Sequence, residues 1–434
     1  MGNYIPNTNA EREEMLAAIG CGNVEELFAQ IPPEVRLNGL LDIPAGLSEK
    51  EVRENVSALA EKNVVFKTIF RGAGAYRHFI PAAVKQIASK EEFVTAYTPY
   101  QAEISQGILQ GIFEFQTMIC ALTGMDVANA SVYDGAEAAA EAVAMCKERK
   151  RVRAFVSATA NPQTIETVKT YCYAAGTPCE IIPAKDGVTD KAALATALGD
   201  DSACVYVEQP NFFGLLENAP ALAETAHAAG AKFIMGVNPL AAAILKTPRE
   251  CGADIAVGEA QPLGLSLAFG GPYLGFMSAT AAMMRKLPGR IVGETKDADG
   301  KRAFVLTLQA REQHIRREKA SSNICSNQAH CALTASVYMS AMGPRGLENA
   351  ARQSMAKAHY MAELLSKIGY KLKFAGAFFH EFVTTTPVPA ADVLATLQAK
   401  GILGGLAISD NEILWCATEE NTKTEIDSVI EILK

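Results

Sequence analysis

The sequence YTPYQAE, residues 97–103, gathers polar and aromatic side chains just before an apolar pattern typical of a helix. A proline-led helix N-terminus flanked by two tyrosines could face a small carboxylate or close a pocket over it. A well-capped helix start whose tyrosines pack between domains explains the same residues equally well. The candidate side chains are Tyr97, Thr98, Tyr100, Gln101 and Glu103.

Basic side chains crowd the stretch REQHIRREK, residues 311–319, and a polar stretch follows it. Such a run could receive an acidic partner or an anionic substrate group. An exposed helix face balanced by Glu312 and Glu318 has equal weight. Cys325 has no base placed beside it, so a structural thiol is favoured over a nucleophile. The candidates are Arg311, His314, Arg316, Arg317, Lys319, Ser321, Ser322 and Asn323.

A glycine-rich turn separates two apolar runs in DIAVGEAQPLGLSLAFGGPYLGF, residues 254–276. The first run ends at Gly258, and no charged side chain occurs between Glu259 and Phe276. Glycine at a strand end lets the backbone approach a ligand, or it makes a tight turn. A loop of similar character, RGAGAYRHFIP, contributes Gly72, Gly74, Tyr76 and His78.

The elements that position these residues follow an alternating pattern between residues 129 and 277. Short β-branched runs separated by amphipathic helices predict a mostly parallel sheet covered on both faces, with ligands at the carboxyl ends of its strands. The predicted strands are 153–158, 179–183, 204–209, 232–237, 254–258 and 273–278. The predicted helices lie near 135–149, 161–175, 188–199 and 217–230.

The flanking segments complete a three-part organisation: a helical arm over 1–90, a large α/β domain over 91–340 and a small α+β domain over 341–434. Capping boxes begin helices in the arm at Thr8 and Ser48. An apolar stripe from Ile104 to Leu122 predicts a long helix after Pro99. A hairpin is predicted between 290–295 and 302–308. In the small domain the predicted order is helix 346–367, strand 377–386, helix 389–400, strand 412–417 and helix 420–433.

Composition limits the classes of partner. The 434 residues are 49% hydrophobic and carry a formal net charge of −8, so no overall positive field would attract nucleic acid or an anionic membrane. The ten cysteines form no CxxC pair and lack the histidine spacing of a zinc site. The N-terminus shows no signal-peptide pattern, and no apolar run reaches the length of a membrane span. These features predict a globular protein in the cytoplasm.

A chain of this size and organisation is common among enzymes that use pyridoxal phosphate (PLP), which requires a phosphate site, a carboxylate for the ring nitrogen and a lysine. At the first of these places, Asp134 and Glu137 favour an ordinary capped helix over an anion site. Asn238 follows the strand where the carboxylate is expected. No lysine occurs between Lys246, which is interpreted as a solvated lysine, and Lys286. The sequence meets none of the three requirements.

Four stretches closely resemble the glycine cleavage system P-protein family, the glycine decarboxylases: TPYQAEISQG, NASVYDGAEAAAEA, GADIAVGEAQPLG with FGGPYLG, and REQHIRREKASSNICSNQ. The similarity covers nearly the whole chain and is to the N-terminal half, which many bacteria encode as a separate alpha subunit. It implies a fold-type I, aspartate aminotransferase-like α/β fold. The beta subunit of that family carries the PLP lysine, followed by a glycine-rich run. If Gly270-Gly271-Pro272 is aligned with that run without gaps, Gln261 falls near the position of the lysine.

The resemblance implies an alpha subunit of glycine decarboxylase without its own covalent cofactor, in an assembly of two alpha and two beta chains. Glycine would be decarboxylated on the PLP of the beta subunit, and the aminomethyl group would pass to the lipoyl group of the H-protein. The first two candidate regions would then shape the shared active site or its interface, with His314, Arg317 and Asn323 in the second. Two alternatives stay open: a self-sufficient PLP enzyme with an unrecognised lysine, and a non-enzymatic scaffold.

Overall fold

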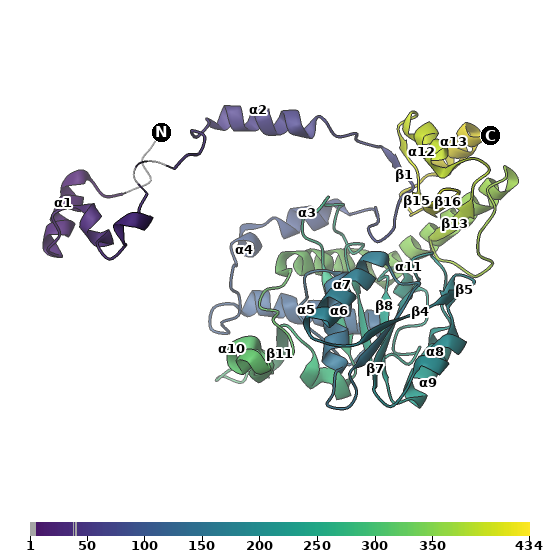
Figure 1. Cartoon of the computed structure of the whole chain (residues 1–434), viewed down its shortest axis with the longest axis horizontal. Helices are drawn as coiled ribbons and strands as arrows, with labels where there is room; N and C mark the ends of the chain where they lie inside the picture. Colours follow the sequence, from purple (N-terminus) through teal and green to yellow (C-terminus); the bar gives the residue numbers. More distant parts are fainter. Residues whose placement is uncertain (1–5, 38, 40) are drawn as a thin grey trace. The chain divides into compact units, whose positions relative to one another are not determined.

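The computed structural model describes residues 6–37, 39 and 41–434. The chain divides into two compact units, Met1–Val65 and Phe66–Lys434 (Figure 1). The predicted domain boundaries after residues 90 and 340 stay predictions. Within the described residues, no helix combines the length and the apolar character that a membrane span requires.

The first unit contains helices α1 (Asn9–Ala18) and α2 (Glu49–Ala60) and the short 3-10 helices η1 (Val24–Phe28) and η2 (Pro33–Val35). Both predicted capping boxes are confirmed. The Thr8 and Ser48 hydroxyls accept from the backbone N–H three residues on, and a glutamate in each box accepts from the cap backbone. These reciprocal bonds satisfy two N–H groups that a helix start leaves without partners.

A seven-stranded sheet with the order β2-β10-β9-β8-β7-β3-β4 forms the centre of the second unit. Strands β4, β3, β7, β8 and β9 run parallel, and β10 pairs antiparallel with both β9 and β2, so the predicted mostly parallel sheet is confirmed. The bounds are β2 Val127–Ala128, β3 Arg153–Ser157, β4 Cys179–Ile182, β7 Ser202–Gln209, β8 Lys232–Val237, β9 Ile255–Glu259 and β10 Gly275–Ala279.

Helices cover both faces of this sheet (Figure 1). Helices α6 (Gly135–Cys146) and α7 (Pro162–Ala174) contribute to the hydrophobic cluster on one face, and α8 (Lys191–Ala197) and α9 (Ala219–Ala228) to a second cluster. The predicted start of α8 at residue 188 is wrong. Val188–Thr189 form strand β6, which pairs with β5 (Ala184–Lys185), and the Asp190 side chain caps the helix that follows.

The long helix predicted from Pro99 begins later, as α5 (Gln106–Thr123). The N–H groups of Ile104 and Ser105 both donate to the Gln101 carbonyl, so a turn precedes the helix. Ile104 is 79% exposed and lies outside the buried stripe. Ile112, Phe115 and Ile119 pack as predicted, because these apolar positions share the face turned toward the core. Ile108 is half-buried, and its neighbour Leu109 is buried instead.

The remaining elements frame the sheet and form the C-terminal part. Helices α3 (Ala82–Ala88) and α4 (Glu91–Val94) precede α5, and the hairpin is confirmed as β11 (Ile291–Lys296) and β12 (Arg302–Thr307). Helix α10 (Gln313–Arg316) lies in the basic region, and α11 (Ala329–Lys367) contains a break at Gly343. The C-terminal elements are β13 Glu381–Thr385, α12 Ala390–Gln398, β14 Ile402–Leu403, β15 Leu406–Ser409, β16 Glu412–Cys416 and α13 Lys423–Leu433; β1 (Thr68–Ile69) pairs with β14.

Candidate functional site

A pocket of about 350 Å³ lies at the carboxyl ends of β7, β8 and β9, where ligands of parallel sheets bind. The strands contribute Glu208, Asn238 and Glu259 to its wall, and the loop before α3 contributes Gly74 and Tyr76. Among the residues that line it there is no lysine or arginine. The pocket is therefore polar and acidic.

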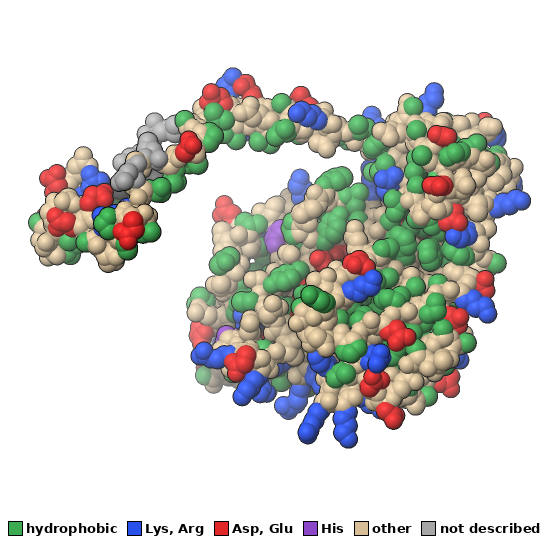
Figure 2. Space-filling model, in the orientation of Figure 1, with side chains coloured by type: hydrophobic (Ala, Val, Ile, Leu, Met, Phe, Trp, Pro, Cys, Tyr) green, Lys and Arg blue, Asp and Glu red, His purple; other side chains and the backbone are tan. Residues whose placement is uncertain are grey.

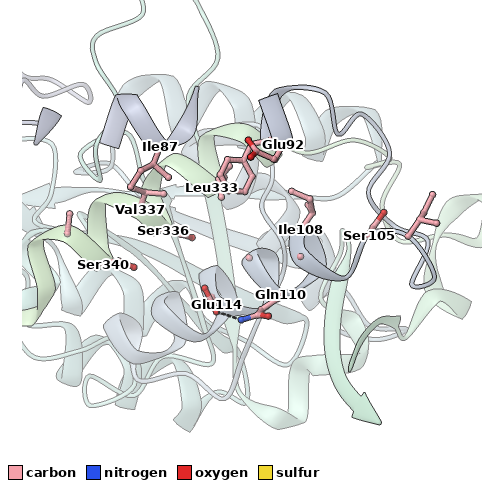
Figure 3. Close-up of a pocket in the computed structure, with 15 residues that line it drawn as sticks. Ile87, Glu92, Ser105, Ile108, Gln110, Glu114, Leu333, Ser336, Val337 and Ser340 are labelled. Atoms are coloured by element: carbon pink, nitrogen blue, oxygen red, sulfur yellow. Dashed lines mark hydrogen bonds between the residues drawn. The ribbon is translucent and has the colours of Figure 1, made fainter. Parts of the chain in front are cut away.

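A larger hollow of about 860 Å³ lies between α3, α4, α5 and α11 (Figure 3). Its lining mixes aliphatic residues, among them Ile104, Ile108 and Leu333, with polar ones. The polar pair drawn there is Gln110, whose amide donates to Glu114 at 2.8 Å. This hollow brings no cluster of acids, bases and nucleophiles together. The smaller strand-end pocket is therefore the better candidate for chemistry.

Carboxylates already occupy the N-terminus of α6 beside the strand-end pocket. The Asp134 side chain accepts from the Glu137 N–H at 2.8 Å, which confirms the capped-helix interpretation. The Glu259 side chain accepts from the Gly135 N–H at 3.0 Å. A helix N-terminus attracts anions through its free N–H groups and its dipole, and here two of those N–H groups are bonded to side chains of the chain itself.

Glu259 binds three backbone N–H groups, those of Gly135, Gln261 and Leu274, at 2.9–3.0 Å. Burial raises the pKa of this carboxyl to about 7, although the three hydrogen bonds lower it. Across the pocket, burial also raises the pKa of Glu208, whose carboxylate accepts from the Asn161 N–H and the Tyr206 hydroxyl. The acids of the pocket thus serve mainly to bind backbone and hydroxyl groups.

Gln261 lies two residues beyond β9 and is not among the residues that line the pocket. Its oxygen accepts from the Tyr76 N–H at 2.9 Å, and its amide nitrogen donates to the Tyr76 carbonyl at 2.8 Å and the Leu265 carbonyl at 2.7 Å. With 1% of its surface exposed, Gln261 fixes the loop of residues 72–79 against the end of β9.

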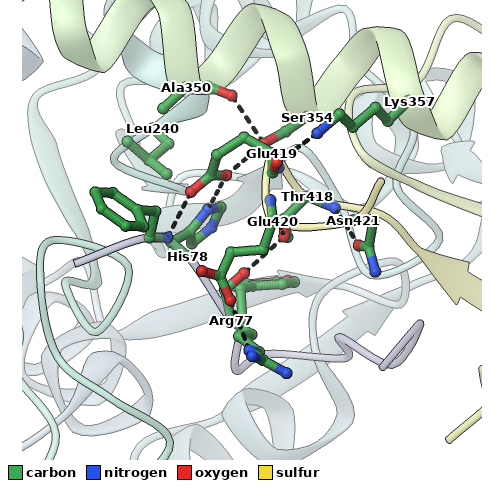
Figure 4. A network of polar contacts seen from close by, with 12 residues as sticks. Arg77, His78, Leu240, Ala350, Ser354, Lys357, Thr418, Glu419, Glu420 and Asn421 are labelled. Atoms are coloured by element: carbon green, nitrogen blue, oxygen red, sulfur yellow. Dashed lines mark hydrogen bonds and ion pairs between the residues drawn. The ribbon is translucent and has the colours of Figure 1, made fainter. Parts of the chain in front are cut away.

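The same loop is bonded to the C-terminal part of the chain (Figure 4). The His78 ring pairs with the Glu419 carboxylate at 2.7 Å, and Arg77 pairs with Glu420 at 2.6 Å. The Tyr76 hydroxyl donates to Glu381 at 2.7 Å. Burial raises the pKa of Glu381 to about 7. His78 is therefore a buried structural residue of this network rather than an open ligand.

The structure brings the two sequence-predicted regions together at one corner. The Tyr100 hydroxyl accepts from the Asn327 amide at 3.4 Å, and the Arg290 guanidinium lies 4.8 Å from the centre of the Tyr100 ring. Arg290 also pairs with Glu312 at 2.8 Å. Figure 2 shows basic side chains near the position of α10, together with acidic ones.

The other predicted residues are not drawn into that contact. Tyr97 is 94% exposed. His314 reaches Glu312 at 3.5 Å, and its side chain is 57% exposed. The exposed members are Tyr97, Thr98, Gln101, Glu103, His314, Arg316, Arg317, Lys319, Ser321 and Asn323. The proposed proline-led helix start is wrong, because Pro99 is buried in the loop and α5 begins at Gln106.

Sequence reasoning missed Arg290, Glu208 and Glu259 as parts of these sites. Arg290 follows the Pro288-Gly289 turn just before β11, a position that carries no motif. Glu208 and Glu259 stand at or next to strand ends, so their positions could have indicated that they face the pocket. Their partners Asn161 and Gly135 lie far away in the sequence and could not be identified from it.

A pair of buried acids on α6 gives a prediction for stability. Burial, followed by the neighbouring Glu141, raises the pKa of Glu137 to about 8, and burial raises that of Glu141 to about 7. A raised folded-state pKa destabilises the protein as pH rises from the unfolded value of 4.5 towards 8. We expect Glu137→Gln to raise the free energy of unfolding by roughly 2–4 kcal/mol at pH 8.5 and by much less at pH 5.

Urea denaturation at the two pH values tests this expectation. Glu224→Gln, which removes an exposed carboxylate on α9, is the matched control and should change stability equally little at both pH values. If the increase in the free energy of unfolding caused by Glu137→Gln does not grow with pH, the role assigned to this carboxyl is wrong.

Comparisons with known proteins agree on one family. The family model described as glycine cleavage system P-protein matches residues 2–433. A protein of Desulfitobacterium hafniense named probable glycine dehydrogenase (decarboxylating) subunit 1 is 50% identical, with 99% of this chain and 98% of the relative covered. A Geobacillus thermodenitrificans protein of the same name is 49% identical, with 98% and 97% covered.

Solved structures extend the similarity to the fold. A crystal structure of glycine decarboxylase (P-protein) of the glycine cleavage system, in inhibitor-bound form, superposes with a TM-score of 0.92 at 40% identity and covers 100% of this chain and 99% of that one. An aspartate aminotransferase from Thermus thermophilus shares the fold at 14% identity, with a TM-score of 0.61 and 85% and 99% covered. These similarities confirm the predicted fold-type I, aminotransferase-like architecture. The chain belongs to the glycine cleavage system P-protein family.

Proposed function

We propose that this chain is the alpha subunit of a two-subunit glycine decarboxylase and that it works without a PLP of its own. The observation that carries the proposal is the strand-end pocket, where PLP chemistry would need cationic and phosphate-binding groups and the chain places carboxylates. Full-length similarity to proteins named subunit 1 supports the same assignment.

The residues of the pocket do not fit PLP. Its lining residues include no lysine that could bind the aldehyde. Glu259 bonds to the α6 N-terminus, where a phosphate would have to displace it against the repulsion of Asp134. Asn238 at the end of β8 offers an amide where a carboxylate would stabilise a ring nitrogen. Each of these groups disfavours the cofactor for an independent physical reason.

Because this chain would not bind PLP, we propose that partner proteins supply the cofactor and the acceptor. A PLP-bearing beta subunit would supply the cofactor, and the assembly would contain two alpha and two beta chains. Glycine would lose its carboxylate as CO2, and its aminomethyl group would pass to the lipoyl disulfide of the H-protein, which is reduced in the process. We propose that the corner formed by Tyr100, Arg290 and Asn327, with the exposed residues around it, contributes to the shared site or to its interface.

Reconstitution tests the proposal. Purified chain incubated with PLP should give no aldimine absorbance and no borohydride-fixed cofactor, because no lysine lines the pocket. Glycine/CO2 exchange should require this chain together with the beta subunit and lipoylated H-protein. A borohydride-fixed PLP on this chain would favour a self-sufficient enzyme. Exchange by beta subunit and H-protein alone, at the same rate, would favour a scaffold.

A further inference from the structure

The corner around Arg290 and Arg311 contains more positive than negative side chains. Two guanidinium groups meet here, because Arg290 pairs with Glu312, the chain neighbour of Arg311, and Arg311 bonds to Gly289, the chain neighbour of Arg290. Arg290 pairs with Glu312 at 2.8 Å, whereas the hydrogen-bond partner of Arg311 is the neutral carbonyl of Gly289, at 2.6 Å. Of these three charged groups two are positive and one is negative, so the Arg311 charge has no ion-pair partner among them.

Several polar atoms of this corner are buried without a partner. They belong to both arginines, at Nε, to Glu312, at Oε1, and to Asn327, at Oδ1. The Glu312 side chain is only 9% exposed. Behind them the Ser131 hydroxyl, fully buried, also lacks a partner, and its backbone lies beside Gly289.

Unpaired buried donors and acceptors cost free energy, and native proteins keep few of them. The two arginine Nε groups are donors that an incoming acceptor could satisfy, whereas Glu312 Oε1 and Asn327 Oδ1 are themselves acceptors. Burial also lowers the pKa of Arg311, although Glu312 opposes the shift. An anion that met both Nε groups would relieve the cost of burying the second guanidinium.

Short helices and two strained backbone positions lie close to Glu312 in the sequence. Residues 313–319 are exposed, and their helices α10 and η6 (Arg317–Lys319) are each a single turn. Leu308 and Arg317 adopt positive φ angles of 54° and 55°, which residues other than glycine rarely adopt. Such strained positions store conformational energy that a new contact can release.

We propose that this corner, formed by Arg290, Arg311, Tyr100 and Asn327, binds a carboxylate. The proposal rests on the proposed function and gives its interface a specific chemistry. A single carboxylate matches the one unbalanced positive charge, whereas a phosphate dianion would exceed it. Guanidinium Nε groups, a tyrosine hydroxyl and an amide supply the donors that a carboxylate accepts. The carboxylate has two possible sources, the glycine substrate or an acidic side chain of the beta subunit.

The test uses the reconstituted complex and the variant Arg311→Gln, which removes the unbalanced charge and leaves the Arg290–Glu312 pair in place. If glycine supplies the carboxylate, the KM for glycine should rise about tenfold or more with a smaller change in kcat. If the beta subunit supplies it, the beta-subunit concentration for half-maximal exchange should rise by a similar factor, and direct binding to the beta subunit should weaken equally.

Arg302→Gln is the matched control, because it removes an exposed guanidinium of the adjacent hairpin, 57% exposed and paired with Glu294. Arg311→Lys should restore part of the lost binding, which a merely folding-related defect would not predict. Thermal unfolding of the free chain identifies a variant that fails to fold. If Arg311→Gln does not fold, Asn327→Asp gives a second measurement of carboxylate binding, because it adds a charge that repels the carboxylate.

An active wild-type complex in which Arg311→Gln and Asn327→Asp both match Arg302→Gln in KM and in beta-subunit affinity would overturn the carboxylate site. That result would leave the proposed function intact. A wild-type chain that fails to support exchange at all would instead overturn the proposed function.

Discussion

Replacing Gln261 with leucine will lower the free energy of unfolding by about 3–5 kcal/mol. The leucine side chain has a similar size but leaves the Tyr76 N–H, the Tyr76 carbonyl and the Leu265 carbonyl without their partner. Each buried group left unpaired costs roughly 1–3 kcal/mol. Equilibrium urea denaturation measures the change. Gln398→Leu, at an exposed position of α12, should stay within about 0.5 kcal/mol of the wild type.

The lysine variant at the same position sharpens this prediction. Gln261→Lys places an ammonium group, which cannot accept a hydrogen bond, opposite the Tyr76 N–H in a site that is 1% exposed. We expect it to be at least as unstable as the leucine variant and to gain no borohydride-fixed PLP. A stable lysine variant that binds the cofactor would show that Gln261 does not lock the loop and that the pocket can accept PLP.

Gly275→Ala should have the other large effect. Gly275 begins β10, and a Cβ atom there would collide with the backbone oxygen of Asp134 and lie 2.5 Å from a methyl group of Val132. The Asp134 carbonyl accepts from the Ala138 N–H at the start of α6, and Gly275 pairs with Glu259 of β9. Neither backbone segment can move aside without disturbing these contacts. We expect a loss of about 4 kcal/mol or more, together with a low yield of soluble protein.

The control for that variant is Gly107→Ala. Gly107 lies in α5, and a Cβ atom there would meet nothing within 4 Å. Alanine favours helix over glycine by about 1 kcal/mol, so this variant should be as stable as the wild type or more so. Equal unfolding midpoints for the two alanine variants would show that the close approach at Gly275 can relax.

These two residues explain the glycine-rich stretch that follows β9. Gly275 is glycine because another segment of backbone, rather than a ligand, comes close to it. Gln261 stands near the place that resemblance gave to a lysine, and its hydrogen bonds serve the loop at Tyr76. These two positions therefore have structural roles in this chain.

Helix caps and strands could be predicted from the sequence, and the misplaced start of α5 has a local cause. The capping boxes at Thr8 and Ser48, the cap at Asp134 and the parallel strands were all predicted, because each depends on residues only a few positions apart. The start of α5 was misplaced because Ile104 fits the helical period, although a turn to Gln101 precedes the helix.

The sequence by itself determined the alternation of strands and helices, the family resemblance and the lack of a lysine between Lys246 and Lys286. Only the tertiary structure decided that Glu259 occupies the start of α6 and that Arg290 joins Tyr100 to the basic region. The reason is physical. Helix caps and strand periods are set by neighbours along the chain, whereas these side-chain contacts join distant segments that meet only when the sheet and its helices are packed.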